Sequence, residues 1–393
     1  MMKKRNVVSA LAALCLVLSG CGASRTESTS SLATSQESVV SAISESVESQ
    51  QSSDGTFRIS ANDSDMAYQE GTDDQPWYLW RRVAESGRGL YYEKNAFLYF
   101  FDLQTGTSVP VCNRPDCSHT DVNCNASLTG DIIGSVINYY DGNIYMCGLD
   151  DSYMCLYRFA ADGSGRQKVM KLYRYAPEDG NGSGEAAMVW APNFILHRGY
   201  VYYYWKEDET GSLYRQKIGS DTAETLYSPG GERPQVYRLE GVGHYVFFQA
   251  GNFLNDDGSE LDISLMAYDT DTGKIETVLP DVYNSYMVTG TDLYYRKSGE
   301  IYHYSMEDGT GEALMQISDS AEFSADADRI YVGDSLTGSF LVYDTSGNYL
   351  GKAGAGDSVT LYMGHNGRIY SMGADGLMLL DATDPDHIVC TGV

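Results

Sequence analysis

The sequence is poor in positive charge. It contains 27 lysine and arginine residues against 54 aspartate and glutamate residues, which gives a formal net charge of −27. A surface with this charge is repelled by the phosphate backbone of nucleic acids and by anionic lipid headgroups. We therefore expect neither a nucleic-acid partner nor a membrane contact made by the protein surface itself.

Sequence motifs that carry catalytic chemistry are also lacking. The chain has no phosphate-binding loop and no glycine-rich motif that leads into a helix. Ser164 and Ser183 lack the glycine two positions earlier that a nucleophile elbow carries. The six histidines form no pattern typical of a catalytic triad. We therefore assign no catalytic residue, and the sequence favours a binding module over an enzyme.

The N-terminus has the pattern of a secretory signal peptide. Three basic residues precede an apolar stretch, Val7 to Leu18, that is short for a membrane-spanning helix. The segment LSGC, Leu18 to Cys21, resembles the lipobox of bacterial lipoproteins, in which the cysteine is acylated and becomes the new N-terminus. An ordinary signal peptide or a single anchor helix is the alternative. We expect residues 1–20 to be the signal peptide and Cys21 to carry the lipid.

A serine-rich segment follows, and we assign residues 21–56 to a tether. Gly22 to Gly55 contains twelve serines and no aromatic residue. Such a segment buries too little apolar surface to offset its ordering entropy, so we expect a flexible chain with a reach of roughly 30 Å. Two or three acyl chains would anchor the protein stably at the extracytoplasmic face of the cell membrane. Residues 57–393 form the remaining domain.

From about residue 76 the chain repeats a pair of short patterns. One is an apolar strand that runs into an aspartate or a glycine turn, and the other is a turn followed by an aliphatic residue and an aromatic. The second pattern includes DGNIYM at Asp141 and NGRIYS at Asn366. Asp-Gly and Asn-Gly are typical of type I′ hairpins, because both central positions need positive φ. The first pattern appears as LYFFDLQTG at Leu98, LYRFAADGSG at Leu156, LYRQKIGSD at Leu213, LMAYDTDTG at Leu265, IYHYSMEDG at Ile301, FLVYDTSG at Phe340 and LMLLDATD at Leu377.

Each repeat predicts a small antiparallel meander of about four strands. A meander of this size cannot bury both faces alone, so neighbouring units must stack. Closure of the stack into a ring also removes most exposed sheet edges. We therefore predict an all-β fold, a β-propeller with seven blades of four-stranded antiparallel meanders. A six-bladed ring with one degenerate unit, or a pair of β-sandwiches, is the alternative.

The lipobox, the serine-rich tether and the IY…LYxYD…G repeats together resemble bacterial surface lipoproteins with YWTD-like or TolB-like β-propellers. The segment VCNRPDCSHTDVNCNA, Val111 to Ala126, is similar to a Cys-Pro-Asp-Cys-x-His segment that such lipoproteins carry near their first blade. The resemblance covers nearly the whole mature chain. It implies the fold and an extracytoplasmic location, and it implies almost no activity.

Six cysteines follow Cys21, and they can be metal-bound, disulfide-bonded or free. Three of them and one histidine lie within thirteen residues, as Cys112, Cys117, His119 and Cys124. Three thiolates and one imidazole are a ligand set for tetrahedral structural zinc. The spacing, C-x4-C-x-H-x4-C, differs from that of common zinc knuckles. Zinc is the only cofactor that the sequence suggests.

In an exported protein, six cysteines also allow three disulfides. Cys147 and Cys155 flank a short segment, and a three- or five-residue hairpin loop would place them opposite each other. The first and last units of a closed ring are neighbours, and each has a cysteine near the end of its outer strand. The expected pairs are Cys147–Cys155, Cys112–Cys390 and Cys117–Cys124.

A candidate binding residue, Trp190, lies in an insertion that lengthens the third unit, Tyr175 to Asn193. Long loops on a rigid scaffold often carry binding groups, although Trp190 could instead pack on its own blade. The function that the sequence favours is a lipid-anchored, extracytoplasmic binding or scaffold module for a protein, peptide or glycan. The alternative is an extracellular hydrolase of glycans or peptides, which for glycans would need convergent carboxylates roughly 5 to 10 Å apart.

Overall fold

The computed structural model describes residues 56–66, 83–132, 136–174, 193–207, 210–231, 234–252, 262–282, 285–318, 320–334, 337–354, 361–362, 367–373 and 376–392. These ranges contain 28 β-strands and one short 3-10 helix, η1 (Ser64–Met66). Among them, no helix is long and apolar enough to cross a membrane. The expected signal peptide, tether, Cys21 and Trp190 lie outside the described residues.

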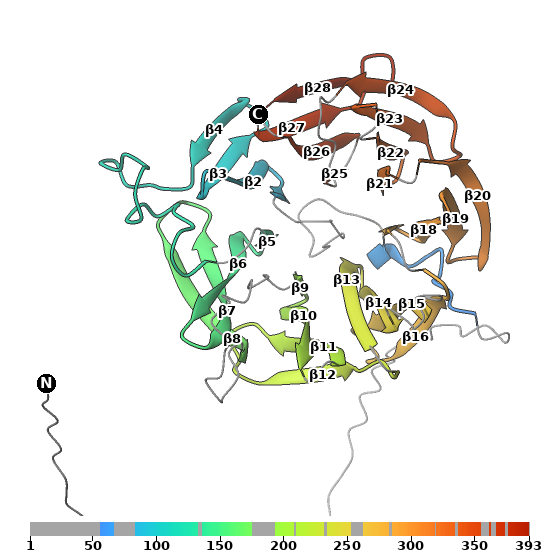
Figure 1. The fold of residues 1–393 in the computed structure, drawn as a ribbon, viewed down its shortest axis with the longest axis horizontal. Helices are drawn as coiled ribbons and strands as arrows, with labels where there is room; N and C mark the ends of the chain where they lie inside the picture. Colours follow the sequence, from blue (N-terminus) through green and yellow to red (C-terminus); the bar gives the residue numbers. More distant parts are fainter. Residues whose placement is uncertain are drawn as a thin grey trace, which may run out of the picture. The chain divides into compact units, whose positions relative to one another are not determined.

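The strands form seven four-stranded antiparallel sheets, which are the blades of a ring (Figure 1). Within each blade the strands pair in chain order, so every blade is a simple meander. The first strand of each blade lies nearest the centre of the ring and the fourth lies at its outer edge (Figure 1). The prediction of an all-β, seven-bladed β-propeller is therefore confirmed, and the six-bladed and sandwich alternatives are wrong.

The first four blades run from β1 to β16. Blade 1 contains β1 (Val83–Ser86), β2 (Gly89–Lys94), β3 (Phe97–Asp102) and β4 (Thr107–Pro110). Blade 2 contains β5 (Asn138–Tyr140), β6 (Asn143–Asp150), β7 (Tyr153–Ala160) and β8 (Arg166–Arg174). Blade 3 contains β9 (Phe194–His197), β10 (Tyr200–Glu207), β11 (Thr210–Lys217) and β12 (Ala223–Tyr227). Blade 4 contains β13 (Pro234–Val242), β14 (Tyr245–Asn252), β15 (Asp262–Asp269) and β16 (Ile275–Leu279).

The last three blades run from β17 to β28. Blade 5 contains β17 (Tyr286–Thr289), β18 (Asp292–Lys297), β19 (Glu300–Ser305) and β20 (Thr310–Gln316). Blade 6 contains β21 (Glu322–Ala325), β22 (Arg329–Asp334), β23 (Ser339–Asp344) and β24 (Tyr349–Gly354). Blade 7 contains β25 (Leu361–Tyr362), β26 (Arg368–Gly373), β27 (Gly376–Asp381) and β28 (Val389–Gly392).

The two repeated sequence patterns form the second and third strands of the blades. The turn that joins β5 to β6 has positive φ at both central residues, 44° at Asp141 and 72° at Gly142. This is the geometry of the type I′ turn that the Asp-Gly pair predicts. Its twist matches that of the flanking strands, so the turn fixes their register.

The core consists of seven separate clusters of buried side chains, each between two neighbouring blades. This follows from the strand period, because successive side chains point to opposite faces of a sheet. In β6, for example, Met146 packs toward blade 1 and Cys147 packs toward blade 3. Both faces of each blade are thereby buried, which explains why the chain is rich in tyrosine, valine and isoleucine.

Side-chain contacts, including a hydrogen bond from the hydroxyl of Tyr370 to the carboxylate of Glu85, close the ring between its first and last blades. Leu90 and Tyr92 of blade 1 share a cluster with Tyr370 and Leu377 of blade 7. Because each described blade is built from consecutive strands, no strand from one end of the chain completes a blade at the other end. The contact between these two blades therefore depends on side chains rather than on a shared sheet.

A short segment before the first blade, residues 56–66, packs across blades 4 and 5. Phe57 lies among their buried side chains, with its ring centroid 5.6 Å from that of Tyr245 and 6.5 Å from that of Phe247. The backbone N–H of Ile59 donates to the carbonyl of Met306 at 2.9 Å. This segment therefore attaches the N-terminal part of the domain to blades 4 and 5 rather than to blade 1.

Replacement of Phe57 by alanine tests this attachment. We expect the Phe57→Ala variant to lose about 3 kcal/mol of unfolding free energy, because it leaves a cavity between blades 4 and 5. The matched control is Val122→Ala, whose side chain is 69% exposed and whose substitution should change stability by less than about 0.5 kcal/mol. Urea denaturation measures both. Equal midpoints for the two variants would contradict the packing described.

Candidate metal centre and inner-strand cluster

The cysteine-rich segment forms a loop at the outer edge of blade 1, between β4 and β5 (Figure 1). Local turns fold it back on itself. The backbone N–H of Cys117 donates to the carbonyl of Arg114 at 3.3 Å, across the turn that contains Pro115. The N–H of Cys124 donates to the carbonyl of Asp121 at 3.1 Å. We call residues 112–124 the cysteine loop.

The cysteine loop brings together the four predicted metal ligands. The Sγ atoms of Cys112, Cys117 and Cys124 and a ring nitrogen of His119 all lie within 4.8 Å of one another. The Nδ1 atom of His119 is 3.4 Å from Sγ of Cys124. His119 has a φ of 55°, a left-handed conformation that few residues other than glycine adopt. The four side chains that the sequence groups therefore lie close together, and metal binding by them stays a prediction.

The thiols of the cluster differ in their electrostatic surroundings. Burial, together with the neighbouring sulfurs of Cys117 and Cys112, raises the pKa of Cys124 to about 11. At Cys112 burial also opposes ionisation, but hydrogen bonds from the backbone N–H groups of Arg114 and Asn125 and from the side chains of Cys124 and Cys117 together lower the pKa. Backbone N–H groups that point at sulfur are the outer-shell contacts that stabilise thiolates in metal sites.

The loop and the residues that follow it contact two blades. On blade 1, the N–H of Leu128 donates to the carbonyl of Ala96 at 2.8 Å. On blade 2, the carbonyl of Gly163, in the turn between β7 and β8, accepts from the N–H of Asn113 at 3.1 Å and from Nδ2 of Asn125 at 2.8 Å. The cysteine loop therefore links the edges of neighbouring blades.

The expected disulfide between Cys147 and Cys155 is wrong. The hairpin that joins β6 to β7 has a two-residue loop, so Cys147 lies opposite Leu156 and Cys155 lies opposite Gly148. This one-residue offset puts the two thiols on opposite faces of blade 2. Cys147 is buried against blade 3, and Cys155 is buried against blade 1. A three- or five-residue loop, which the pairing required, is absent from this hairpin.

The expected ring-closing disulfide between Cys112 and Cys390 is also wrong. The thiol of Cys112 belongs to the cluster in the cysteine loop, whereas Cys390 packs with the side chains between blades 6 and 7. Cys390 thus faces the preceding blade rather than the first one. Cys117 and Cys124 do lie close together, but within the same four-residue cluster and as free thiols. All six cysteines of the described residues are free.

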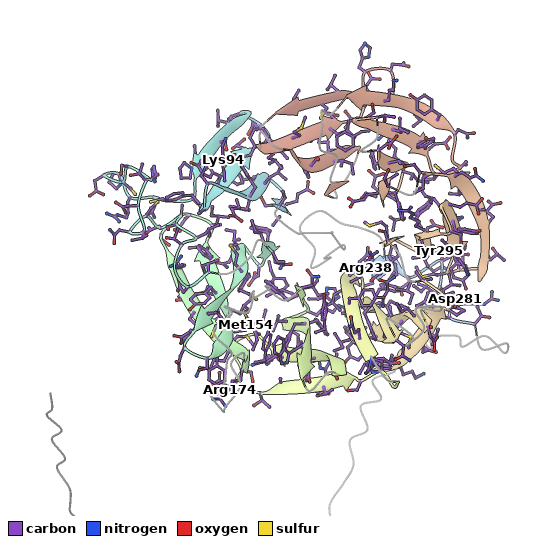
Figure 2. The ribbon with its side chains drawn as sticks, viewed as in Figure 1. Lys94, Met154, Arg174, Arg238, Asp281 and Tyr295 are labelled. Atoms are coloured by element: carbon purple, nitrogen blue, oxygen red, sulfur yellow. The ribbon has the colours of Figure 1, made fainter. Side chains whose placement is uncertain are left out.

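Sequence reasoning missed a polar cluster on the inner strand of blade 4. The strand β13 contains a bulge between Tyr237 and Glu240, where its register with β14 shifts. Arg238 lies in this bulge with a φ of 55°, on the inner side of the ring (Figure 2). The hydroxyl of Tyr286 donates to the carbonyl of Arg238, and the carboxylate of Glu240 accepts from the N–H of Val288 at 3.0 Å. These two bonds hold the bulge against blade 5.

Arg238 carries a positive charge in a place with little water. Its Nη1 atom is inaccessible to solvent. Burial lowers the pKa of Arg238. Tyr237, Tyr286 and Glu322 raise it, but burial has the larger effect. Glu322 lies on β21, the inner strand of blade 6, so groups from different blades act on the same guanidinium. The available sequence signal was the loss of strict alternation in PQVYRLEGV, which indicates a bulge.

Comparisons with known proteins identify the fold and no more. No family model matches the chain, and no curated protein matches it. A structure from work on two prolyl endopeptidases aligns with a TM-score of 0.52 and 10% identity, over 82% of this chain and 48% of that one. This chain therefore spans about half the length of that structure. At this level of identity the likeness concerns the β-propeller fold alone.

Two further solved structures are similar to this chain with lower TM-scores. A chain of a nidogen/laminin complex aligns with a TM-score of 0.41 and 11% identity, over 70% of this chain and 96% of that one. A putative TolB from Agrobacterium tumefaciens aligns with a TM-score of 0.35 and 11% identity, over 70% and 82% of the two chains. The likeness is one of fold, and the lipoprotein part of the resemblance stays a prediction.

Substitution of Gly163 tests the contact between the cysteine loop and blade 2. Gly163 has a φ of 74°, and an added Cβ would lie 2.7 Å from the backbone nitrogen of Cys112. Gly142 is a matched control, because its φ is 72° and an added Cβ would meet nothing within 4 Å. Both alanine variants should lose about 1 kcal/mol from the left-handed backbone. Gly163→Ala should lose about 1 to 3 kcal/mol more, because the loop must move.

Chemical denaturation measures the two losses, and the reaction rate of the loop thiols with a disulfide reagent reports the displacement of the loop. We expect faster thiol modification in Gly163→Ala than in Gly142→Ala. If the two variants were equally stable and equally reactive, the loop would not rest on blade 2 as described.

Proposed function

We propose that this protein is a lipid-anchored, extracytoplasmic β-propeller that binds a protein, peptide or glycan. The lipobox-like segment ending at Cys21 and the serine-rich tether support the anchoring. The single observation that carries the binding function is Arg238, an arginine held in a bulge of an inner strand with part of its guanidinium removed from water. Bulges and left-handed non-glycine residues are enriched at functional sites, where they aim a side chain.

The surroundings of Arg238 suggest what kind of group it recognises. The protein is strongly acidic, so the positive charge of Arg238 on an inner strand is opposite in sign to the net charge of the molecule. Arginine binds carboxylates in a planar, two-point arrangement, and the nearby tyrosines offer hydroxyls and aromatic surface. A ligand with an acidic group, such as a peptide carboxylate or an acidic sugar, fits this chemistry. Glu322, which acts electrostatically on Arg238, would orient the guanidinium rather than contact the ligand.

Loss of the Arg238 charge tests the binding function. Wild type and Arg238→Gln are compared on arrays of peptides and glycans, with Arg88→Gln as the control, because the Arg88 side chain is 83% exposed on blade 1. We expect at least a tenfold loss of affinity in Arg238→Gln, about 1.4 kcal/mol, and none in the control. Thermal unfolding of all three proteins checks that the variants are folded.

The same experiment separates binding from hydrolysis. Ligands recovered with unchanged mass support a binding module, and cleaved ligands support the alternative of an extracellular hydrolase. Equal binding by wild type and Arg238→Gln would contradict the role of Arg238.

Removal of the expected acylation site tests the anchor. When cells that express the full chain are fed an alkyne-labelled fatty acid, the wild type should become labelled. The Cys21→Ser variant should lose the label and keep its signal peptide. The matched control is Cys15→Ser, in the apolar stretch, which should be labelled like the wild type because its thiol is removed with the signal peptide. Retained label in Cys21→Ser would contradict lipidation at Cys21.

A further inference from the structure

We propose that the cysteine loop binds one Zn²⁺ through Cys112, Cys117, His119 and Cys124, and that this ion fastens blade 1 to blade 2. The inference is independent of the proposed binding function, because the loop lies at the outer edge of the ring. It joins two observations. One is the convergence of four soft ligands, and the other is the position of the loop across the edges of two blades.

The geometry of the ligand atoms fits a tetrahedral zinc ion. Zinc bonds sulfur at about 2.3 Å and nitrogen at about 2.0 to 2.1 Å in tetrahedral sites, so two sulfurs lie about 3.8 Å apart and a nitrogen and a sulfur about 3.6 Å apart. The four ligand atoms lie within 4.8 Å of one another, and His119 Nδ1 lies 3.4 Å from Cys124 Sγ. Small rotations of the side chains are therefore enough to place all four at bonding distance.

The ligand set selects both the metal and its role. Thiolates with one imidazole favour zinc over the hard cations magnesium and calcium, which prefer oxygen. Four protein ligands fill a tetrahedral site and leave no position for a substrate or a reactive water, so the ion is structural. An odd number of thiols also argues against disulfide chemistry as the full account of the loop. A disulfide between any two of the three cysteines would not explain why the third thiol and His119 lie beside them.

The loop transmits the effect of the ion to two blades. Cys112 directly follows Val111, whose N–H donates to the carbonyl of Leu98 on blade 1 at 2.9 Å. Asn113 and Asn125, next to two of the ligands, both donate to Gly163 on blade 2. A little beyond the loop, Nη1 of Arg166 on blade 2 donates to the carbonyl of Ser127 at 2.5 Å. Binding of the ion would order the loop and, with it, these contacts.

The metal content of the full chain tests the site. The protein is purified in mild detergent under oxygen-free conditions without reductant. Its zinc content is measured by elemental mass spectrometry and by mass spectrometry of the intact protein. We expect one zinc per chain in the wild type and in the Cys390→Ser control, and at least a fivefold lower content in Cys117→Ser. His119→Ala should bind zinc at least tenfold more weakly in a chelator competition, and His119→Cys should restore the affinity.

The cobalt-substituted wild type gives a readout that does not depend on any variant. Tetrahedral cobalt with three thiolates should show intense visible bands and a thiolate charge-transfer band, and cyanide should not change them if the site is closed. Hydrogen exchange then tests the role between the blades. Removal of the metal should speed exchange in the cysteine loop and in the β7–β8 turn, residues 161–165, and leave β18 of blade 5 unchanged.

Three results would overturn the proposal. A wild-type chain without metal, whose mass indicates a disulfide within the loop, would replace the zinc site by a disulfide. Equal zinc content in Cys117→Ser, Cys390→Ser and wild type would mean that the metal binds elsewhere. Full zinc binding without any change of hydrogen exchange at the β7–β8 turn would refute the link between the blades.

Discussion

The packing of each blade against its two neighbours is the interaction on which the rest of the structure depends. Every described core cluster lies between blades, so each sheet buries side chains on both of its faces. A shift of one residue in a strand would move each of its side chains to the opposite face of the sheet. Side chains that pack against one neighbouring blade would then face the other. The register of every blade is therefore fixed more strongly than that of a sheet with one solvated face.

Two departures from regular structure occur at the edges of this packing. At the outer edge of blade 1, the fourth strand is only four residues long and gives way to the cysteine loop. On the inner strand of blade 4, a bulge places Arg238 where a regular strand could not. Both irregularities are held by contacts to an adjacent blade, through Gly163 in the first case and Tyr286 in the second. The rigid ring is what allows each of them to keep a defined geometry.

Much of the fold could be predicted because its signals are local. Alternating apolar residues identify the second and third strands of each blade, and an Asp-Gly pair identifies a turn with positive φ at both positions. The closeness of Cys112, Cys117, His119 and Cys124 could be predicted for the same reason, since they lie within thirteen residues. The bulge at Arg238 was missed because a bulge depends on how two strands pair. The signal peptide, the lipid at Cys21 and the role of Trp190 remain predictions.

The sequence by itself determined the all-β class, the repeated meander and the grouping of Cys112, Cys117, His119 and Cys124, because strand period, turn chemistry and short spacing act over a few residues. The tertiary structure decided which cysteines share a face and which blades meet. Cys147 and Cys155 are separated by one residue of register, and Cys390 faces blade 6 rather than blade 1. Such outcomes depend on hairpin loop length and on contacts between distant parts of the chain.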